Sequence, residues 1–424
     1  MPHFAILSPS FAGHLVPCLV IGRHLQERGH RITVISDEQA QTAVVSYGLD
    51  FRILPKSSHP SWWLTPLLIL GWPFGQAPNV LLRQLFSETA IRWLTEAPSI
   101  LEALSVDALI IEQFVTAGGS IASLFGLPFA TVSTAIDMRT HPSHPPPFTP
   151  WAYSEEWTAY LRNRAAHALW GWFMAPTLAA INGWRGKHGL ANLQHADELL
   201  SKQANILQGC SEFDFPRMAT SWRHYGGCLS CDVGRAEVAF PWDKLDGRPL
   251  VFASFGTLHA RRNLPMLELV AKVCAQLPVQ LVLSRGRWNN DDDVPGLGHH
   301  FAGDPIVVDF APQLDLLERS ALMINHGGIN SVMEALSCGV PQVICPRSVD
   351  QPGTAARAVR AGVALVHPFG RMSVKGLRQV VERVLFEECF RVRAQVVKQQ
   401  LNATGGSIGA ADFIERSLIS RRDF

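Results

Sequence analysis

Short apolar runs alternate with longer helical patterns along this chain, and the alternation occurs twice. In the first half the runs are HFAILSPS (3–10), HRITVIS (30–36), DALIIE (107–112) and FATVS (129–133), with a helical pattern around Pro17–Glu27. Strands that alternate with helices form parallel sheets covered on both faces. The first half therefore predicts a doubly wound α/β domain.

The same rhythm restarts in the second half and predicts a second domain of this kind. Its apolar runs are PLVFASFG (249–256), VQLVLSRG (279–286), PIVVDFA (305–311), ALMINH (321–326) and PQVICP (341–346). The expected fold class is α/β, with two Rossmann-like domains.

A stretch without clear periodicity around Val233–Pro249 separates the two series, as a linker would. We place the N-terminal domain at 1–235 and the C-terminal domain at 236–395. Residues 396–424 are expected to be a helical segment that packs back on the N-terminal domain.

Composition limits the class of protein and its location. The net charge is +1, so we expect no nucleic-acid partner. The start of the chain has no basic segment before its apolar run, which argues against a secretory signal. The eight cysteines are scattered, as in proteins of a reducing compartment, and a cytoplasmic location is expected. One CxxC, Cys228–Cys231, has no second pair and is weak as a metal site.

Polar and glycine residues follow three of the predicted strands. In open α/β sheets, ligands bind beyond the carboxyl ends of the strands. The three places are SFAGHLVP (10–17), Glu112, and NHGGINSVMEAL (325–336). These strand ends are the candidate functional positions.

The third place combines a histidine, two glycines and a helix start. Glycines allow close approach of a ligand, free N–H groups at a helix start favour a phosphate, and His326 can donate to it. A purely structural alternative is a capping box, in which Glu334 would reach back to the helix cap and Ser331 would need no other role.

A longer pattern discriminates between these alternatives. The segment from FAPQLDLL through MINHGGINSVMEALSCGVPQVICP to AGVAL (310–365) resembles the donor-binding signature of the inverting UDP-glycosyltransferases of the GT-B class. Within this family the chain is similar to bacterial zeaxanthin glucosyltransferases, notably in HFAILSPSFAGH (3–14), in EFDFPR (212–217) and in DQPGTAAR (350–357). The similarity covers most of the chain and is loosest between about 55 and 200.

This resemblance implies two facing domains with an interdomain cleft, the N-terminal one for the acceptor and the C-terminal one for the nucleotide sugar. It also implies donor-binding residues. They are Phe310 and Gln313 at the uracil, Glu334 at the ribose, His326, Gly328, Asn330, Ser331, Gly256 and Thr257 at the diphosphate, and Asp350 and Gln351 at the sugar hydroxyls.

His14 matches the catalytic histidine of the family, and an imidazole can accept a proton near neutral pH. The family orients this base with an aspartate, where this chain has Glu112. The extra methylene keeps the charge but changes the reach. Asp107 is a weaker substitute because it begins the strand.

The implied reaction is an inverting transfer of a hexose, glucose from UDP-glucose, to a hydroxyl of a lipophilic acceptor such as a carotenoid. Macrolide, polyphenol and sterol acceptors stay open, as do a sugar-nucleotide epimerase and a non-catalytic sugar-nucleotide-binding protein. No metal or other cofactor is expected. The acidic run Asp291–Asp293 is interpreted as a solvated loop.

Tryptophan and a second apolar segment bear on the acceptor. Eleven of the twelve tryptophans precede residue 243, and they either pack helices or line an apolar acceptor pocket. Residues 61–75 are apolar but too short and too rich in proline to span a bilayer. They either belong to the core or give a peripheral contact at the inner face of the membrane.

Overall fold

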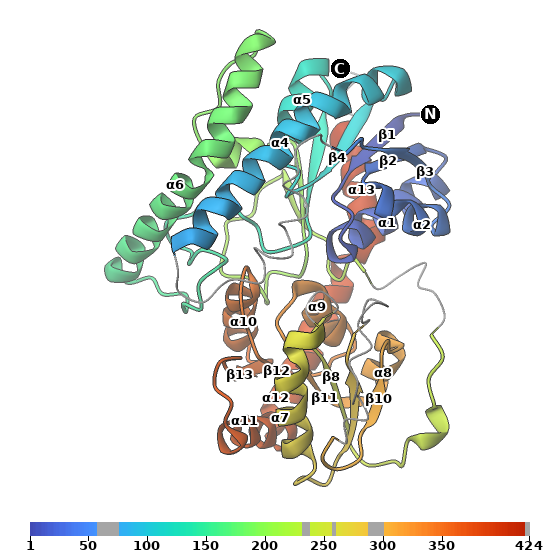
Figure 1. The fold of residues 1–424 in the computed structure, drawn as a ribbon, viewed down its shortest axis with the longest axis vertical. Coiled ribbons are helices and arrows are strands. Elements are labelled where there is room, and N and C mark those ends of the chain that lie inside the picture. Colours follow the sequence, from blue (N-terminus) through green and yellow to red (C-terminus); the bar gives the residue numbers. More distant parts are fainter. Residues whose placement is uncertain (57–75, 231–237, 257–259, 287–300, 420–424) are drawn as a thin grey trace.

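The structure, a computed structural model, describes residues 1–56, 76–230, 238–256, 260–286 and 301–419. It contains two parallel β-sheets with helices packed on them, one sheet in each half of the chain (Figure 1). The apolar segment 61–75, Thr257 and Asp291–Asp293 lie outside the described residues.

The N-terminal sheet has seven parallel strands in the order β3-β2-β1-β4-β5-β6-β7. The four strands predicted in this half are present, and three further strands join them. The seven are β1 (His3–Leu7), β2 (Arg31–Ser36), β3 (Asp50–Ile53), β4 (Ala108–Glu112), β5 (Phe129–Ser133), β6 (Ala204–Leu207) and β7 (Arg223–Tyr225).

Helices cover both faces of this sheet, because its central strands are apolar on both sides. In β1, Phe4 and Ile6 pack into one core cluster, whereas Ala5 and Leu7 pack into another. The first cluster includes α1 and the last helix of the chain, and the second includes α4, α5 and α6. The helices of this half are α1 (Ala12–Glu27), α2 (Gln41–Ser46), α4 (Gln76–Leu104), α5 (Gly118–Phe125) and α6 (Trp157–Lys187).

The C-terminal sheet has six parallel strands in the order β10-β9-β8-β11-β12-β13. Its strands are β8 (Leu250–Ser254), β9 (Gln280–Ser284), β10 (Ile306–Val308), β11 (Ser320–Asn325), β12 (Gln342–Ile344) and β13 (Ala364–Val366). Its helices are α7 (Ala260–Cys274), α8 (Gln313–Arg319), α9 (Ile329–Ser337), α10 (Gln351–Arg360), α11 (Val374–Phe386) and α12 (Glu388–Ala403). The first strand of each half lies next to the fourth, where the strand order reverses.

The last helix, α13 (Gly406–Leu418), leaves the C-terminal half and packs on α1 (Figure 1). Its apolar side, including Ile414, belongs to the core cluster of α1. Polar contacts flank this apolar side of α13. Ser407 Oγ lies 3.1 Å from His24 Nε2, and an Asp412 oxygen lies 2.6 Å from Arg28. The chain therefore crosses between its halves twice.

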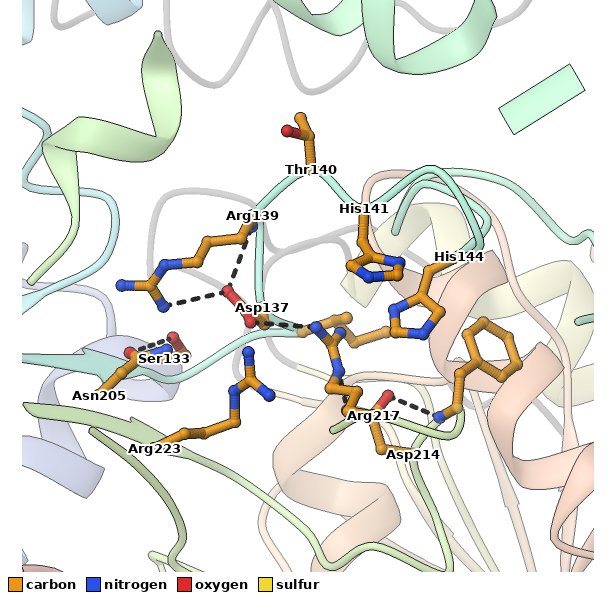
Figure 2. Close-up of polar contacts among 12 residues, drawn as sticks. Ser133, Asp137, Arg139, Thr140, His141, His144, Asn205, Asp214, Arg217 and Arg223 are labelled. Atoms are coloured by element: carbon orange, nitrogen blue, oxygen red, sulfur yellow. Dashed lines mark hydrogen bonds and ion pairs between the residues drawn. The ribbon is translucent and has the colours of Figure 1, made fainter. Parts of the chain in front are cut away.

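A buried ionic cluster joins the two halves. Asp214, which follows β6, accepts hydrogen bonds of 2.7 Å from Nε of Arg217 and 2.7 Å from Nε of Arg357 in α10. Figure 2 shows Asp137 lying between Arg217 and Arg139. Burial alone would raise the pKa of Asp214, but the two arginines hold that pKa well below its usual range. The EFDFPR stretch thus supplies an interdomain contact.

Two further observations bear on the sequence expectations. No helix within the described ranges is long and apolar enough to cross a membrane. Cys228 is disulfide-bonded, which differs from the expectation of reduced cysteines.

Candidate active site

Three adjacent strands of the N-terminal sheet place His14, Glu112 and Thr134 together. β1 pairs with β4, and β4 pairs with β5, all in parallel. Their carboxyl ends therefore meet at one edge of the sheet, at the point where the strand order reverses. His14 lies in the first turn of α1, Glu112 ends β4, and Thr134 directly follows β5.

Both carboxylate oxygens of Glu112 are engaged. Oε1 lies 3.0 Å from His14 Nδ1 and accepts a 2.5 Å hydrogen bond from the Thr134 hydroxyl. Oε2 accepts a 2.8 Å hydrogen bond from the backbone N–H of Phe114. The Glu112 side chain is fully buried, and the longer glutamate reaches the histidine with hydrogen-bonding geometry.

These contacts determine the tautomer and the basicity of His14. A carboxylate only accepts, so Nδ1 carries the proton and Nε2 keeps its lone pair. Burial alone would lower the pKa of His14, but the charge and hydrogen bond of Glu112, with the charge of Asp350, raise it above the ordinary value. The imidazole ring stands edge-on to Phe114 at a centroid distance of 5.0 Å, and the side chain is 28% exposed.

Asp107, the weaker substitute for Glu112, lies at the opposite end of β4. Its Oδ2 accepts a 2.8 Å hydrogen bond from the backbone N–H of His3, the first residue of β1. Since the amino and carboxyl ends of a parallel sheet are its opposite edges, Asp107 does not reach His14.

In the C-terminal half, β8 and β11 are neighbours, and their ends place Gly256 and Gly328 against His326. A Cβ on Gly256, whose φ is +77°, would lie 3.1 Å from His326 Cε1. A Cβ on Gly328 would lie 2.6 Å from His326 Nε2. A side chain at Gly328 would clash with the imidazole, and the positive φ of Gly256 favours glycine there, beside the start of α9.

Glu334, one turn into α9, is buried and held by two donors. Its Oε1 accepts a 2.7 Å hydrogen bond from Ser230 Oγ, and its Oε2 accepts a 2.6 Å hydrogen bond from Gln313 Nε2. The cap of α9 is Gly328, and no side chain caps the helix there. The capping-box alternative for Ser331 and Glu334 is therefore wrong.

Asn330 bridges the two domains. Its Nδ2 donates to the carbonyl of Gly13, next to the histidine, at 2.8 Å. Its Oδ1 accepts a 2.6 Å hydrogen bond from Gln208 Nε2, which also lies 2.9 Å from the carbonyl of Thr134. The start of α9 thus lies directly against the edge of the N-terminal sheet that carries His14.

The start of α10 faces the same edge. Asp350 interacts electrostatically with His14 and accepts a hydrogen bond from the backbone of Ile136. Burial raises the pKa of Asp350. Gln351 Oε1 accepts from the backbone N–H groups of Arg347 and Ser348 at 2.9 and 3.1 Å.

Phe310, which the sequence analysis places at the uracil, precedes α8 and its side chain is 39% exposed.

Thr134, Gln208 and Ser230 contact the predicted site residues but were missed by sequence reasoning. Thr134 and Gln208 directly follow β5 and β6, so their position as polar residues at strand ends was the signal that could have identified them.

In the described part of the chain, no group of three or more His, Cys, Asp or Glu side chains could hold a metal ion.

Comparison with known proteins identifies the family. The family model described as "UDP-glucoronosyl and UDP-glucosyl transferase" matches residues 189–398. The chain is 30% identical over 427 residues to a zeaxanthin glucosyltransferase of Pseudescherichia vulneris, covering 99% of this chain and 98% of that protein. It is 29% identical over 423 residues to the zeaxanthin glucosyltransferase of Pantoea ananas, covering 99% and 96%.

Solved structures show the same fold. The glycotransferase of kitacinnamycin superposes with a TM-score of 0.75 at 24% identity, covering 98% of this chain and 99% of that one. The calicheamicin glycosyltransferase CalG4 superposes with a TM-score of 0.74 at 18% identity, covering 99% and 98%. The chain therefore belongs to the UDP-glycosyltransferase family and has its GT-B fold of two Rossmann-like domains.

Proposed function

We propose that this chain is an inverting, metal-independent glucosyltransferase that uses UDP-glucose and a lipophilic acceptor, with a carotenoid diol such as zeaxanthin foremost. The observation that best supports this proposal is the position of His14. It is hydrogen-bonded to Glu112 and interacts electrostatically with Asp350 of the opposite domain. The two relatives that are zeaxanthin glucosyltransferases support the donor and the acceptor class.

In the proposed reaction, His14 Nε2 takes the proton of the acceptor hydroxyl while its oxygen attacks the anomeric carbon from the face opposite the nucleotide. The bond from that carbon to the phosphate oxygen breaks, and UDP leaves with the electron pair. N–H groups at the start of α9, together with His326, stabilise the leaving diphosphate. One displacement converts an α-linked donor into a β-glucoside.

The remaining donor contacts follow the order of the nucleotide sugar. Phe310 and Gln313 would lie at the uracil and Glu334 at the ribose. Asp350 would hold sugar hydroxyls, and Gln351 would offer its amide nitrogen, since its Oε1 already accepts from the backbone. The contacts proposed for the diphosphate are those of Gly256, Thr257, His326, Gly328, Asn330 and Ser331.

Replacing Glu334 tests this donor site. Glu334→Ala removes charged acceptors for the ribose hydroxyls, and such hydrogen bonds contribute about 1.5–3 kcal/mol each. We expect the KM for UDP-glucose to rise by about 10–100-fold, with a smaller change in kcat. Initial rates at varied UDP-glucose measure this, with Glu318→Ala on an exposed position of α8 as the matched control. An unchanged KM would remove Glu334 from the donor site.

A run of aromatic rings supports an apolar acceptor. It starts at Phe114, beside His14, and continues through Phe86 of α4 at 6.3 Å to Phe173 of α6 at 5.9 Å. Trp170 then stacks on Phe173 at 5.3 Å. These rings are half-buried, and aromatic surfaces of this kind bind apolar ligands.

An acceptor panel tests the substrate. The chain is incubated with UDP-glucose and with zeaxanthin in liposomes, a macrolide, a polyphenol, a sterol or no acceptor. Mass spectrometry is expected to detect zeaxanthin glucoside, and NMR a β-linkage. Glucosylation of polyphenol without glucosylation of zeaxanthin would overturn the carotenoid assignment but not the transferase. UDP release without acceptor would point to an epimerase or hydrolase, and donor binding without any turnover to a non-catalytic protein.

We expect EDTA to leave the rate unchanged, because hydrogen bonds from the helix-start N–H groups and from His326 would stabilise the diphosphate in place of a metal. The measurement compares initial rates with EDTA, with Mg²⁺ and with Mn²⁺. A loss in EDTA that either cation restores would direct attention to Asp291–Asp293 as a metal site.

A further inference from the structure

The outer face of α6 carries an unusual concentration of exposed apolar side chains. Within its first sixteen residues, Trp157 is 73%, Leu169 60% and Trp172 55% exposed. Tyr160 and Leu161 are also exposed. At 3.6 residues per turn, these five positions fall within about half of the helix circumference. We call them the α6 outer face.

Single exposed apolar residues are common, but a contiguous group of this kind marks an interaction surface. Figure 1 shows α6 as the outermost helix on its side of the N-terminal domain, alongside α4, against which it packs. The half of α6 that carries the group lies toward the C-terminal domain, where the helix begins.

The charges of this helix have one sign. The sequence of α6, Trp157–Lys187, contains arginine, lysine and histidine but no aspartate or glutamate. Arg164 is exposed and lies over the Tyr160 ring, and Arg83 of α4 lies 3.8 Å from the centre of the Trp172 ring. Two acidic residues, Glu155 and Glu156, precede the helix. The apolar group is thus accompanied by cations on the helix itself.

The outer face also connects to the candidate active site. Trp172 neighbours Phe173, and Phe173 belongs to the aromatic run that leads through Phe86 and Phe114 to His14. Arg83 strengthens the junction of α4 and α6, because its guanidinium donates to the carbonyls of Trp172 and Phe173 at 2.9 and 3.2 Å. One helix thus carries an apolar outer surface and, on its inner side, the aromatic rings that lead to the base.

We propose that the α6 outer face docks on a lipid bilayer that contains anionic lipid. Tryptophan and tyrosine side chains favour the membrane interface, leucine enters the apolar layer, and arginine attracts anionic headgroups. An acceptor dissolved in the bilayer then leaves it beside the aromatic run. This second statement rests on the proposed function, whereas the docking itself does not.

Vesicle co-sedimentation of the full chain tests the docking without any enzymatic readout. The vesicles are phosphatidylcholine alone or phosphatidylcholine with phosphatidylglycerol, and no carotenoid is present. Trp157→Ser/Trp172→Ser is expected to weaken partitioning on the mixed vesicles by about tenfold or more. The matched control is Phe386→Ser/Val392→Ser, which changes two residues that are 58% and 52% exposed in the C-terminal half. It should bind as the wild type does.

Two further variants separate the causes. Arg164→Gln should weaken binding to the mixed vesicles and leave binding to phosphatidylcholine unchanged. Trp157→Ser/Leu161→Ser leaves the Arg83–Trp172 contact intact, and it serves if loss of Trp172 unfolds the protein. Equal binding of wild type and variants would overturn the proposal. So would a dimer in gel filtration that only the α6 variants dissociate, because the face would then join two copies of the chain.

The enzymatic arm distinguishes this proposal from the proposed function. An α6 variant should lose rate with zeaxanthin in liposomes but keep the wild-type rate with zeaxanthin in detergent micelles. If the wild type sediments with vesicles but glucosylates no carotenoid in either form, the docking stands and the acceptor assignment fails.

Discussion

His14→Ala is expected to abolish transfer and to leave UDP-glucose binding within a few-fold of that of the wild type. The imidazole is the only proposed proton acceptor, and its Nδ1 is occupied by Glu112 and Thr134. Loss of a general base slows a reaction by about 10²–10⁴-fold. The donor contacts come from the other domain, so they should persist. Single-turnover rates measure the first expectation, and calorimetric titration with UDP-glucose measures the second.

The variant should remain folded, because Glu112 retains the hydrogen bonds from Thr134 and the Phe114 N–H. Thermal unfolding monitored by circular dichroism checks this. A His14→Ala enzyme that turns over within a few-fold of wild type would show that another group is the base. A variant that loses donor binding as well would show that His14 acts on the donor.

Glu112→Gln is expected to lower the rate by about 10²-fold or more, because an amide cannot stabilise an imidazolium. The local geometry adds a second reason. Glu112 offers separate oxygens to His14 and to the Phe114 N–H, whereas glutamine has one carbonyl oxygen. If that oxygen accepts from the Phe114 N–H, the NH2 group of the glutamine faces His14 Nδ1, which can then only accept a hydrogen bond. The ring proton then lies on Nε2, and His14 cannot act as the base.

The same variant should shift the pH dependence. Glu112 raises the pKa of His14, whereas burial lowers it. The base must be neutral, so the wild-type kcat/KM should increase with pH through a value above the ordinary 6.5 of histidine. Without the carboxylate the pKa falls, and this limb should move to lower pH while the maximal rate drops.

Two variants of β4 complete the test. Glu112→Asp keeps the charge but shortens the reach, so it should retain more activity than the glutamine variant. Asp107→Asn, at the opposite end of the strand, should leave the pH profile unchanged. A Glu112→Gln profile that coincides with the wild-type profile would assign the raised pKa of His14 to another group.

The central strands of both sheets could be predicted because their sequences are apolar on both faces. Sequence reasoning missed four strands. One of them, β6 (ANIL), is buried but only four residues long, and the other three lie at the edges of the sheets. β3 (DFRI) and β7 (RHY) are the edges of the N-terminal sheet and are at least partly exposed, and β13 (ALV) is an edge of the C-terminal sheet. An edge strand needs a partner on only one side and packs less apolar surface, so its composition resembles that of a loop.

The strand ends that carry His14, Glu112 and His326 could be found from local patterns, since apolar runs end where polar residues begin. Which side chains meet at those ends follows from the strand pairing instead. The contact of Glu112 with His14 depends on the parallel pairing of β1 and β4, and the contact of Thr134 with Glu112 depends on the pairing of β4 and β5. Asn330 reaches the Gly13 carbonyl because α9 and α1 start at facing sheet edges. These contacts join residues from 22 to 317 positions apart, and no local pattern encodes them.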